Sequence, residues 1–111
     1  MMQKLVNYHS NLAHGTVFRF PGSYPHEKYV DLMLVEFPDS DRKFGLVVST
    51  GHKAGLILVK LPKEAESNNF AGIDRQWVID NWNKWIYETC NVDDVYVIQN
   101  YSIPVIDYSK P

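Results

Sequence analysis

Four histidines are the first residues whose chemistry could define a function for this chain. They are spread over different segments, at His9, His14, His26 and His52. Their spacing matches no known zinc-binding pattern, and no cysteine cluster supports them, so we predict no metal site and no cofactor. Two of them could still act as general acid and base in a small hydrolase or ribonuclease, because such catalysis needs well-placed side chains and no linear motif.

The other reactive groups of the chain also favour ordinary structural roles. Cys90 is the one cysteine, so no intramolecular disulfide is possible. We place it near the C-terminal end of a helix, where the helix dipole would raise the thiol pKa and disfavour a nucleophilic thiolate. Residues 49–55 hold two glycines and a lysine without the spacing of a phosphate-binding loop, and therefore predict a hairpin loop. We predict no catalytic residue and no enzyme.

Charge and hydropathy narrow the classes of partner. Residues 1–61 hold seven Lys/Arg and five Asp/Glu, which gives +2, whereas residues 62–94 hold three Lys/Arg and seven Asp/Glu, which gives −4. A basic stripe for nucleic acid is absent, and no apolar run approaches the length of a membrane span. With a lone cysteine and no secretory leader at Met1, we expect a cytoplasmic protein without nucleic-acid or membrane partners.

The apolar pattern predicts an α+β fold in one domain, residues 1–111. Short loops join strongly β-prone segments, so we expect an antiparallel meander of about five strands with one tryptophan-rich helix packed on one face. The expected strands cover residues 15–20, 29–37, 44–50, 56–61 and 95–101. The segment 3–13 fits neither a strand nor a helix period and stays open.

The expected helix spans residues 74–89 and carries all three tryptophans. Asp74 is a suitable N-cap, and Asn91 could end the helix in a left-handed conformation. Helical spacing aligns one apolar stripe, from which we assign Trp82, Trp85 and Ile86 to the core. Trp77 lies at the edge of the stripe and Tyr87 on the polar side.

A short aromatic motif in this helix carries a family resemblance. Residues 77–87 contain Asn81-Trp82 with Trp85 and Tyr87, and residues 92–97 add an acidic turn and a valine-rich strand. This combination resembles the immunity proteins of bacterial polymorphic-toxin systems, of the contact-dependent growth inhibition kind. The resemblance covers about 25 residues at the motif itself, while the preceding strands agree in order and length.

The resemblance implies a binding function without turnover. Such a protein stays in the cytosol of the producing cell and neutralises the C-terminal domain of a cognate toxin, for example a nuclease, by covering its active site or a nearby surface. An acidic surface would suit the basic groove of a nuclease. Because aromatic and charged residues outside the stripe are good interface candidates, we predict partner contacts at Trp77, Asp80, Lys84, Tyr87 and Glu88, and secondarily at Glu64, Glu66, Asp93 and Asp94. A self-associating structural or adaptor module is a further alternative.

Overall fold

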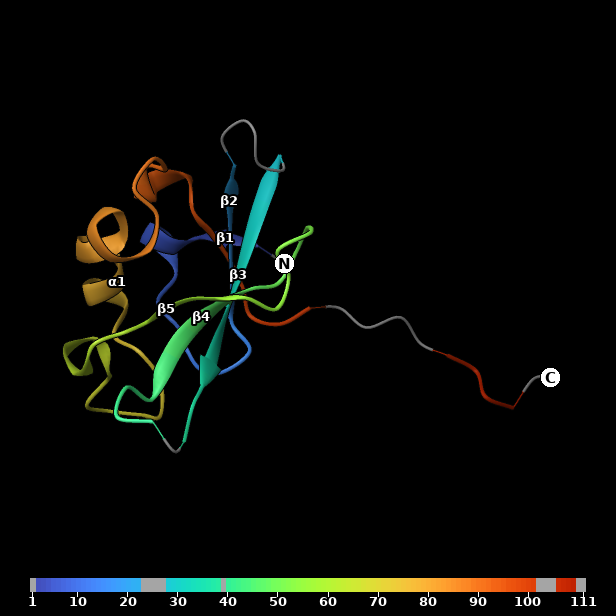
Figure 1. The fold of residues 1–111 in the computed structure, drawn as a ribbon, viewed down its shortest axis with the longest axis horizontal. Helices are drawn as coiled ribbons and strands as arrows, with labels where there is room; N and C mark the ends of the chain where they lie inside the picture. The colour runs from blue at the N-terminus through green and yellow to red at the C-terminus, as the bar shows by residue number, and fades with distance from the viewer. Residues whose placement is uncertain (1, 23–27, 39, 102–105, 110–111) are drawn as a thin grey trace.

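One antiparallel sheet organises the molecule. The computed structural model describes residues 2–22, 28–38, 40–101 and 106–109. In this part of the chain six strands pair in the order β1-β6-β2-β3-β4-β5, with the helix α1 on one face (Figure 1). The strands are β1 (Gln3–Lys4), β2 (Val17–Pro21), β3 (Tyr29–Glu36), β4 (Phe44–Val48), β5 (Ile57–Lys60) and β6 (Tyr96–Ile98).

The sheet confirms the predicted α+β class and the meander. Strands β2 to β5 follow one another in space as they do in sequence, because short connections favour antiparallel neighbours. The last strand, β6, returns to pair with β2. The structure has one strand more than predicted, β1, in the segment 3–13, whose periodicity favoured neither a strand nor a helix. This strand pairs with β6 and is followed by a 3-10 turn, Leu5–Asn7. Two-residue strands are too short to show a period.

The helix begins as predicted and ends earlier. The Asp74 carboxylate accepts a hydrogen bond from the backbone N–H of Trp77 at 3.2 Å, which confirms it as the N-cap of α1 (Arg75–Asn81). The helix continues as a π-turn, Trp82–Ile86, and stops there. The predicted end at residue 89 was wrong. Asn91 is not left-handed, with φ of −67°, and its side chain instead accepts from Asp93 N–H to begin the 3-10 turn Val92–Asp94.

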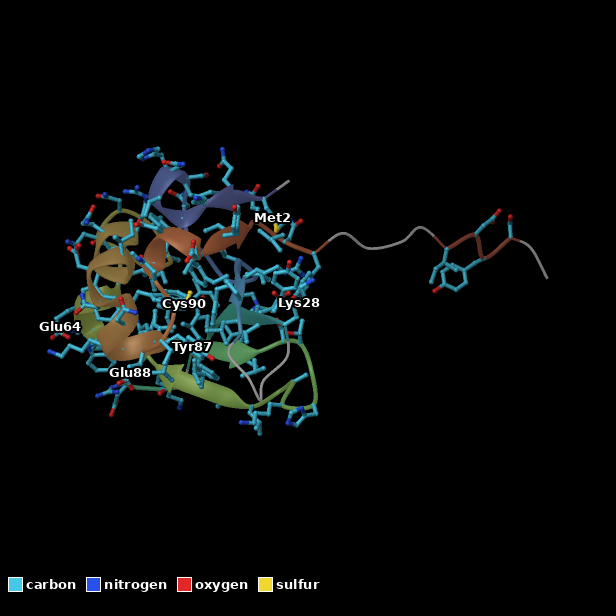
Figure 2. All side chains as sticks on the ribbon, turned by 90° about the horizontal axis from the view of Figure 1, so that it is seen from above. Met2, Lys28, Glu64, Tyr87, Glu88 and Cys90 are labelled. Atoms are coloured by element: carbon cyan, nitrogen blue, oxygen red, sulfur yellow. The ribbon has the colours of Figure 1, made fainter. Side chains whose placement is uncertain are left out.

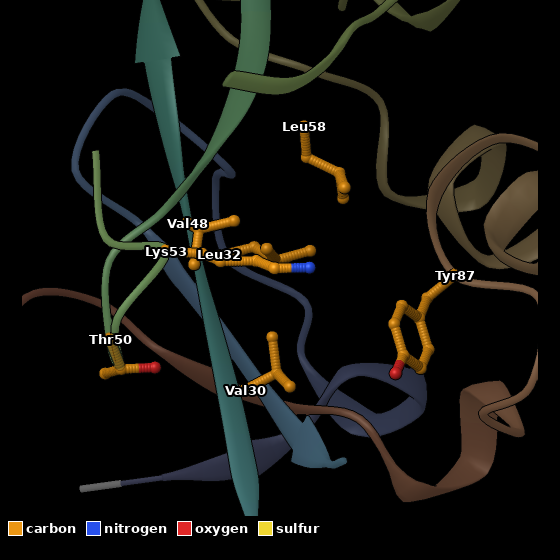
Figure 3. A pocket seen from close by; sticks show the side chains of 7 residues that line it. All are labelled: Val30, Leu32, Val48, Thr50, Lys53, Leu58 and Tyr87. Atoms are coloured by element: carbon orange, nitrogen blue, oxygen red, sulfur yellow. The ribbon is translucent and has the colours of Figure 1, made fainter. Parts of the chain in front are cut away.

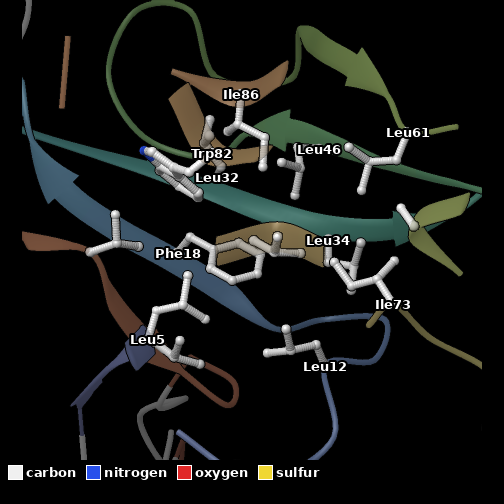
Figure 4. Close-up of a cluster of buried hydrophobic side chains, with 14 of the residues drawn as sticks. Leu5, Leu12, Phe18, Leu32, Leu34, Leu46, Leu61, Ile73, Trp82 and Ile86 are labelled. Atoms are coloured by element: carbon white, nitrogen blue, oxygen red, sulfur yellow. The ribbon is translucent and has the colours of Figure 1, made fainter. Parts of the chain in front are cut away.

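The core lies between the helix and one face of the sheet. Trp82 is fully buried and meets the ring edges of Phe18 and Phe20, at centroid distances of 5.9 and 5.3 Å. Figure 4 shows this indole among aliphatic side chains from β3 and β4 and from the N-terminal segment. The core assignment of Trp82 and Ile86 is confirmed. Trp85 differs, since it is half-buried at the edge of the cluster.

The opposite face of the sheet contains an ion pair between a half-buried arginine and a buried aspartate. Asp31 on β3 is fully buried, and its carboxylate accepts two hydrogen bonds from the Arg19 guanidinium on β2, at 2.7 and 2.8 Å. The Tyr101 hydroxyl donates to the same carboxylate at 2.7 Å and lies 2.7 Å from Ser49 Oγ. Each carboxylate oxygen is thus hydrogen-bonded, as a charge in such a place requires.

This network changes the acidity of its members. The hydrogen bond with Asp31 raises the pKa of the Arg19 guanidinium above its ordinary value. Burial raises the pKa of the Tyr101 hydroxyl, and its hydrogen bond to the Asp31 carboxylate raises it further, against an opposing effect of the Ser49 hydrogen bond. The network therefore connects β2 and β3, through Arg19 and Asp31, with the segment after β6. Tyr101 in that segment also contacts Ser49, just after β4.

Substitution of Trp82 tests the core. Trp82→Ala is expected to lower the free energy of unfolding by roughly 3–5 kcal/mol, because it leaves a large cavity beneath the helix. The measurement is urea unfolding followed by far-UV circular dichroism. Trp82→Phe is the matched control and should lose clearly less, since it keeps a ring against Phe18 and Phe20. Equal losses in the two variants would contradict this account of the core.

Substitution of Tyr101 tests the network on the other face. Tyr101→Phe removes the hydrogen bond to the Asp31 carboxylate and is expected to cost on the order of 1.5 kcal/mol at neutral pH. In the unfolded chain the tyrosine ionises at about pH 10, whereas the native state keeps its proton to higher pH. Stability of the wild type should therefore fall as pH rises above about 10, and less steeply in the variant. Identical pH slopes would refute the assignment.

Candidate functional site

The π-turn at the end of the helix positions Tyr87. The backbone N–H of Tyr87 donates to Trp82 O at 2.9 Å, five residues earlier, and Tyr87 itself is extended at φ −147° and ψ 113°. The chain therefore leaves the helix at this residue. Its ring turns toward the sheet and packs on Phe20, with centroids 4.6 Å apart. Regular helical spacing placed Tyr87 on the polar side, and it missed the π-turn that redirects the ring. Such turns recur at functional sites.

Asn83 fixes the segment that follows. Its side-chain amide donates to the backbone carbonyls of Tyr87, Glu88 and Cys90, at 3.2, 3.2 and 2.6 Å. These are carbonyl groups beyond the end of the helix, which would otherwise depend on water. Sequence spacing assigned Asn83 to the polar face and gave it no role. An asparagine within a turn of a helix end is the signal that could have identified it.

Tyr87 forms one wall of an apolar groove. The groove has a volume of about 100 Å³ and is lined by three strands and the β4–β5 loop, with Tyr87 on the far side (Figure 3). Its other lining residues are Val30, Leu32, Val48, Thr50, Lys53 and Leu58. The two polar lining residues, Thr50 and Lys53, lie in the β4–β5 loop. A groove of this size can hold one apolar side chain of a partner.

An exposed apolar run borders the groove. Leu56, Ile57 and Leu58 are 59, 51 and 42 % exposed, although each is an aliphatic residue. They lie at and before the start of β5, the strand at one edge of the sheet. Consecutive exposed aliphatic residues at a sheet edge are characteristic of interaction sites. The sequence showed this run as a fourth strand, and it could not show that the strand is an edge.

Two tryptophans and an arginine continue this surface. Trp77 and Trp85 are both half-buried, with ring centroids 5.9 Å apart. The Arg42 guanidinium lies 5.8 Å above the Trp85 ring and donates to Lys60 O on β5 at 3.2 Å. These contacts connect the helix to β5. Arg42 was not among the predicted contact residues.

The remaining predicted contact residues are distributed over three elements. Asp80, Lys84 and Glu88 are exposed on the helix and just after it, and Glu64 is exposed in the 3-10 turn Lys63–Ala65, on the same side of the molecule as Glu88 (Figure 2). Glu66 is half-buried after that turn. Asp93 and Asp94 are exposed in a separate 3-10 turn, and Asp94 lines a second hollow of about 510 Å³ with Met2, Arg19, Phe20, Pro21, Tyr29 and Tyr96.

His14 and His52 lie near opposite ends of β3. His14 Nδ1 accepts from the backbone N–H of Glu36, the last residue of β3. His52 lies in the β4–β5 loop, shortly after Ser49. The backbone N–H of Ser49 donates to Asp31 O near the start of β3. His26 lies outside the described residues. Within the described ranges, no group of three or more His, Cys, Asp or Glu side chains could hold a metal ion.

Cys90 is buried, with its thiol 3.3 Å from Asn91 O. Burial raises the pKa of this thiol, and the nearby Asp94 charge raises it further. The direction agrees with the sequence prediction, but the cause differs, because the helix ends four residues before Cys90. The described helices also include none long and apolar enough to cross a membrane.

Comparison with known proteins decides the family. The model of a family described as Immunity protein 45 matches residues 5–97. The chain belongs to the Immunity protein 45 family. The match confirms the resemblance to toxin immunity proteins and gives this family member a general immunity role with a toxin protein as partner. No curated protein and no solved structure matches the chain.

The role of Asn83 can be tested through Cys90. Asn83→Ala removes the amide that holds three carbonyls, so residues 87–90 should open more often and the Cys90 thiol should react faster with iodoacetamide at pH 8. The reaction is followed by mass spectrometry. Asn81→Ala is the matched control, because the Asn81 amide bonds to Trp77 O within the helix. Equal rates in the two variants would contradict the proposed role.

Proposed function

We propose that this family member neutralises a cognate toxin of the contact-dependent growth inhibition kind, in the cytosol of the producing cell. It would bind the C-terminal toxin domain and cover its active site or an adjacent surface, with no turnover and no cofactor. The observation that carries the proposal is the family match over residues 5–97.

The surface formed by the helix end and β5 supports a binding function. Trp77, Trp85 and Tyr87 present half-buried aromatic rings at its border, and aromatic residues that are partly exposed before binding are frequent interface hot spots. Arg42 lies against Trp85 on the same surface. Aromatic residues and arginine are enriched in protein interfaces. We therefore keep Trp77 and Tyr87 as proposed contacts.

The exposed carboxylates support a contribution to association. Asp80, Glu88 and Glu64 lie exposed around the helix, with Lys84 between them in sequence. If the toxin is a nuclease, its substrate groove carries positive charge, and exposed carboxylates on the inhibitor would speed the encounter. Glu66, Asp93 and Asp94 are proposed as a peripheral part of the same electrostatic effect, since they lie on other turns.

Stoichiometry tests the proposed function. The purified protein is titrated against the toxin domain encoded beside its gene, with toxin activity and isothermal calorimetry as readouts. An inhibitor that acts by binding should protect fully at about one molecule per toxin. An enzyme that destroyed the toxin or repaired its damage would protect at far smaller ratios. Absence of a complex by calorimetry would refute the proposal.

Substitution of Trp77 separates binding from folding. Trp77→Ala is expected to weaken the complex by at least about tenfold, as an interface aromatic does, while it lowers the stability far less than Trp82→Ala because Trp77 is half-buried. The matched control is Tyr29→Ala, an exposed aromatic on the other side of the sheet. Wild-type affinity in Trp77→Ala would remove this residue from the proposed interface.

A further inference from the structure

Strand β5 presents an open backbone edge. In the described sheet it pairs with β4 alone. Leu61 N–H donates to Phe44 O and Val48 N–H donates to Leu56 O, which fixes the hydrogen-bonded positions of the pair. Lys60 and Ile57 lie opposite Gly45 and Val47 at the alternate positions. In an antiparallel pair those positions direct their N–H and C=O groups away from the partner strand, so both groups of Ile57 and the N–H of Lys60 face the open edge. The Lys60 carbonyl already accepts from the Arg42 guanidinium at 3.2 Å.

A register shift in β5 adds a side-chain site to this edge. Leu46 pairs with Val59 and Val47 pairs with Ile57, so Leu58 is an extra residue without a partner in β4. The Leu58 side chain lines the apolar groove opposite Tyr87 (Figure 3). A strand added to β5 would therefore have both a backbone edge and an adjacent apolar groove, which together provide affinity and specificity in strand addition.

The charged side chains within residues 42–63, which lie between Asp41 and Glu64, are all positive. Residues 42–63 contain Arg42, Lys43, Lys53, Lys60 and Lys63 and no Asp or Glu. In the described part of the chain the contacts of Arg42 and Lys60 are to uncharged groups: the Trp85 ring and Lys60 O for Arg42, and Ser40 Oγ and the Phe37 ring for Lys60. Neither cation is therefore paired with a carboxylate among the described residues, so both can contact carboxylates of a partner. An apolar edge framed by uncompensated cations is complementary to an apolar segment with carboxylates.

We propose that β5 is where the toxin attaches, through an extended acidic segment that adds to the sheet as a further strand. One apolar side chain of that segment occupies the groove beside Leu58 and Tyr87, and its carboxylates face the lysines of the β4–β5 hairpin. The proposal rests on the proposed function and names the contact that it uses. It also divides the binding surface into two regions. The acidic side of the helix would contact a basic part of the toxin, and the basic hairpin would contact an acidic part.

The same charges argue against a second copy of this chain as the occupant. Pairing β5 with β5 across a two-fold axis would bring two hairpins together at strand distance, each with a charge of +2 from Lys53 and Lys60. Like charges opposed across a strand pair are destabilising. An acidic heterologous segment meets no such repulsion.

The test uses the full-length protein and the toxin domain encoded beside its gene. Leu58→Glu places a carboxylate in the groove at an exposed position and is expected to weaken the complex by about thirtyfold or more, the size of a hot-spot loss. Lys53→Glu combined with Lys60→Glu should slow association, and the remaining association rate should depend less on salt. Ile106→Glu is the matched control, because Ile106 is an exposed aliphatic residue outside the sheet, beyond β6, that lines neither the groove nor the second hollow. It should bind as the wild type does.

Amide hydrogen exchange on the wild type gives a readout that does not depend on the variants. The Ile57 and Lys60 amides should become protected in the complex, at least about tenfold, if a strand pairs with this edge. Unchanged exchange at both amides, or wild-type affinity of Leu58→Glu, would overturn the proposal while a measurable complex leaves the immunity function standing. A dimer in sedimentation that Leu58→Glu dissociates would show that a second copy occupies the edge, which also overturns it. Absence of any wild-type complex would instead refute the proposed function.

Discussion

Burial of the Trp82 indole between the helix and β2 is the constraint on which the arrangement depends. Its ring meets Phe18 and Phe20, so the helix can lie on the sheet in one position along β2. The burial has a cost, because Trp82 Nε1 lacks a hydrogen-bond partner among the described residues. The large apolar area of the indole offsets that cost. The position of this ring then sets where the helix can end.

The end of the helix follows from that anchor. A regular α-helix through residue 89 would carry Tyr87 to the solvent side, whereas the π-turn starting at Trp82 releases the chain at Tyr87. Asn83 compensates by donating to the carbonyls that the early ending leaves exposed. The ring of Tyr87 is thereby held over the sheet, where it forms the apolar groove with Leu58. The candidate site is therefore a consequence of how the core tryptophan is packed.

The two faces of the sheet have different tasks. On the face away from the helix, the buried Asp31 carboxylate accepts hydrogen bonds from the half-buried Arg19 and from Tyr101. Removing Arg19 would leave the buried Asp31 charge without its cation, which is costly. That face is fixed by internal contacts. The proposed binding surface lies instead at the β5 edge, where Arg42 contacts both Lys60 O on the strand and the Trp85 ring.

The local elements and the family motif could be predicted from the amino-acid sequence. Alternating β-prone residues, the Asp74 cap and the stripe through Trp82 depend on near neighbours, so the strands of the meander, the helix start and the central core residue were predictable. The Asn81-Trp82 motif was enough to indicate an immunity protein. The contact residues on the helix were predicted from regular helical geometry. That geometry placed Tyr87 on the polar side and Trp85 in the core, whereas both are half-buried in the fold. Three features became visible only in the folded chain: β5 is an edge strand, Asp31 is paired with Arg19, and the helix ends in a π-turn. Each depends on contacts between residues far apart in the chain, which periodicity along the sequence does not record.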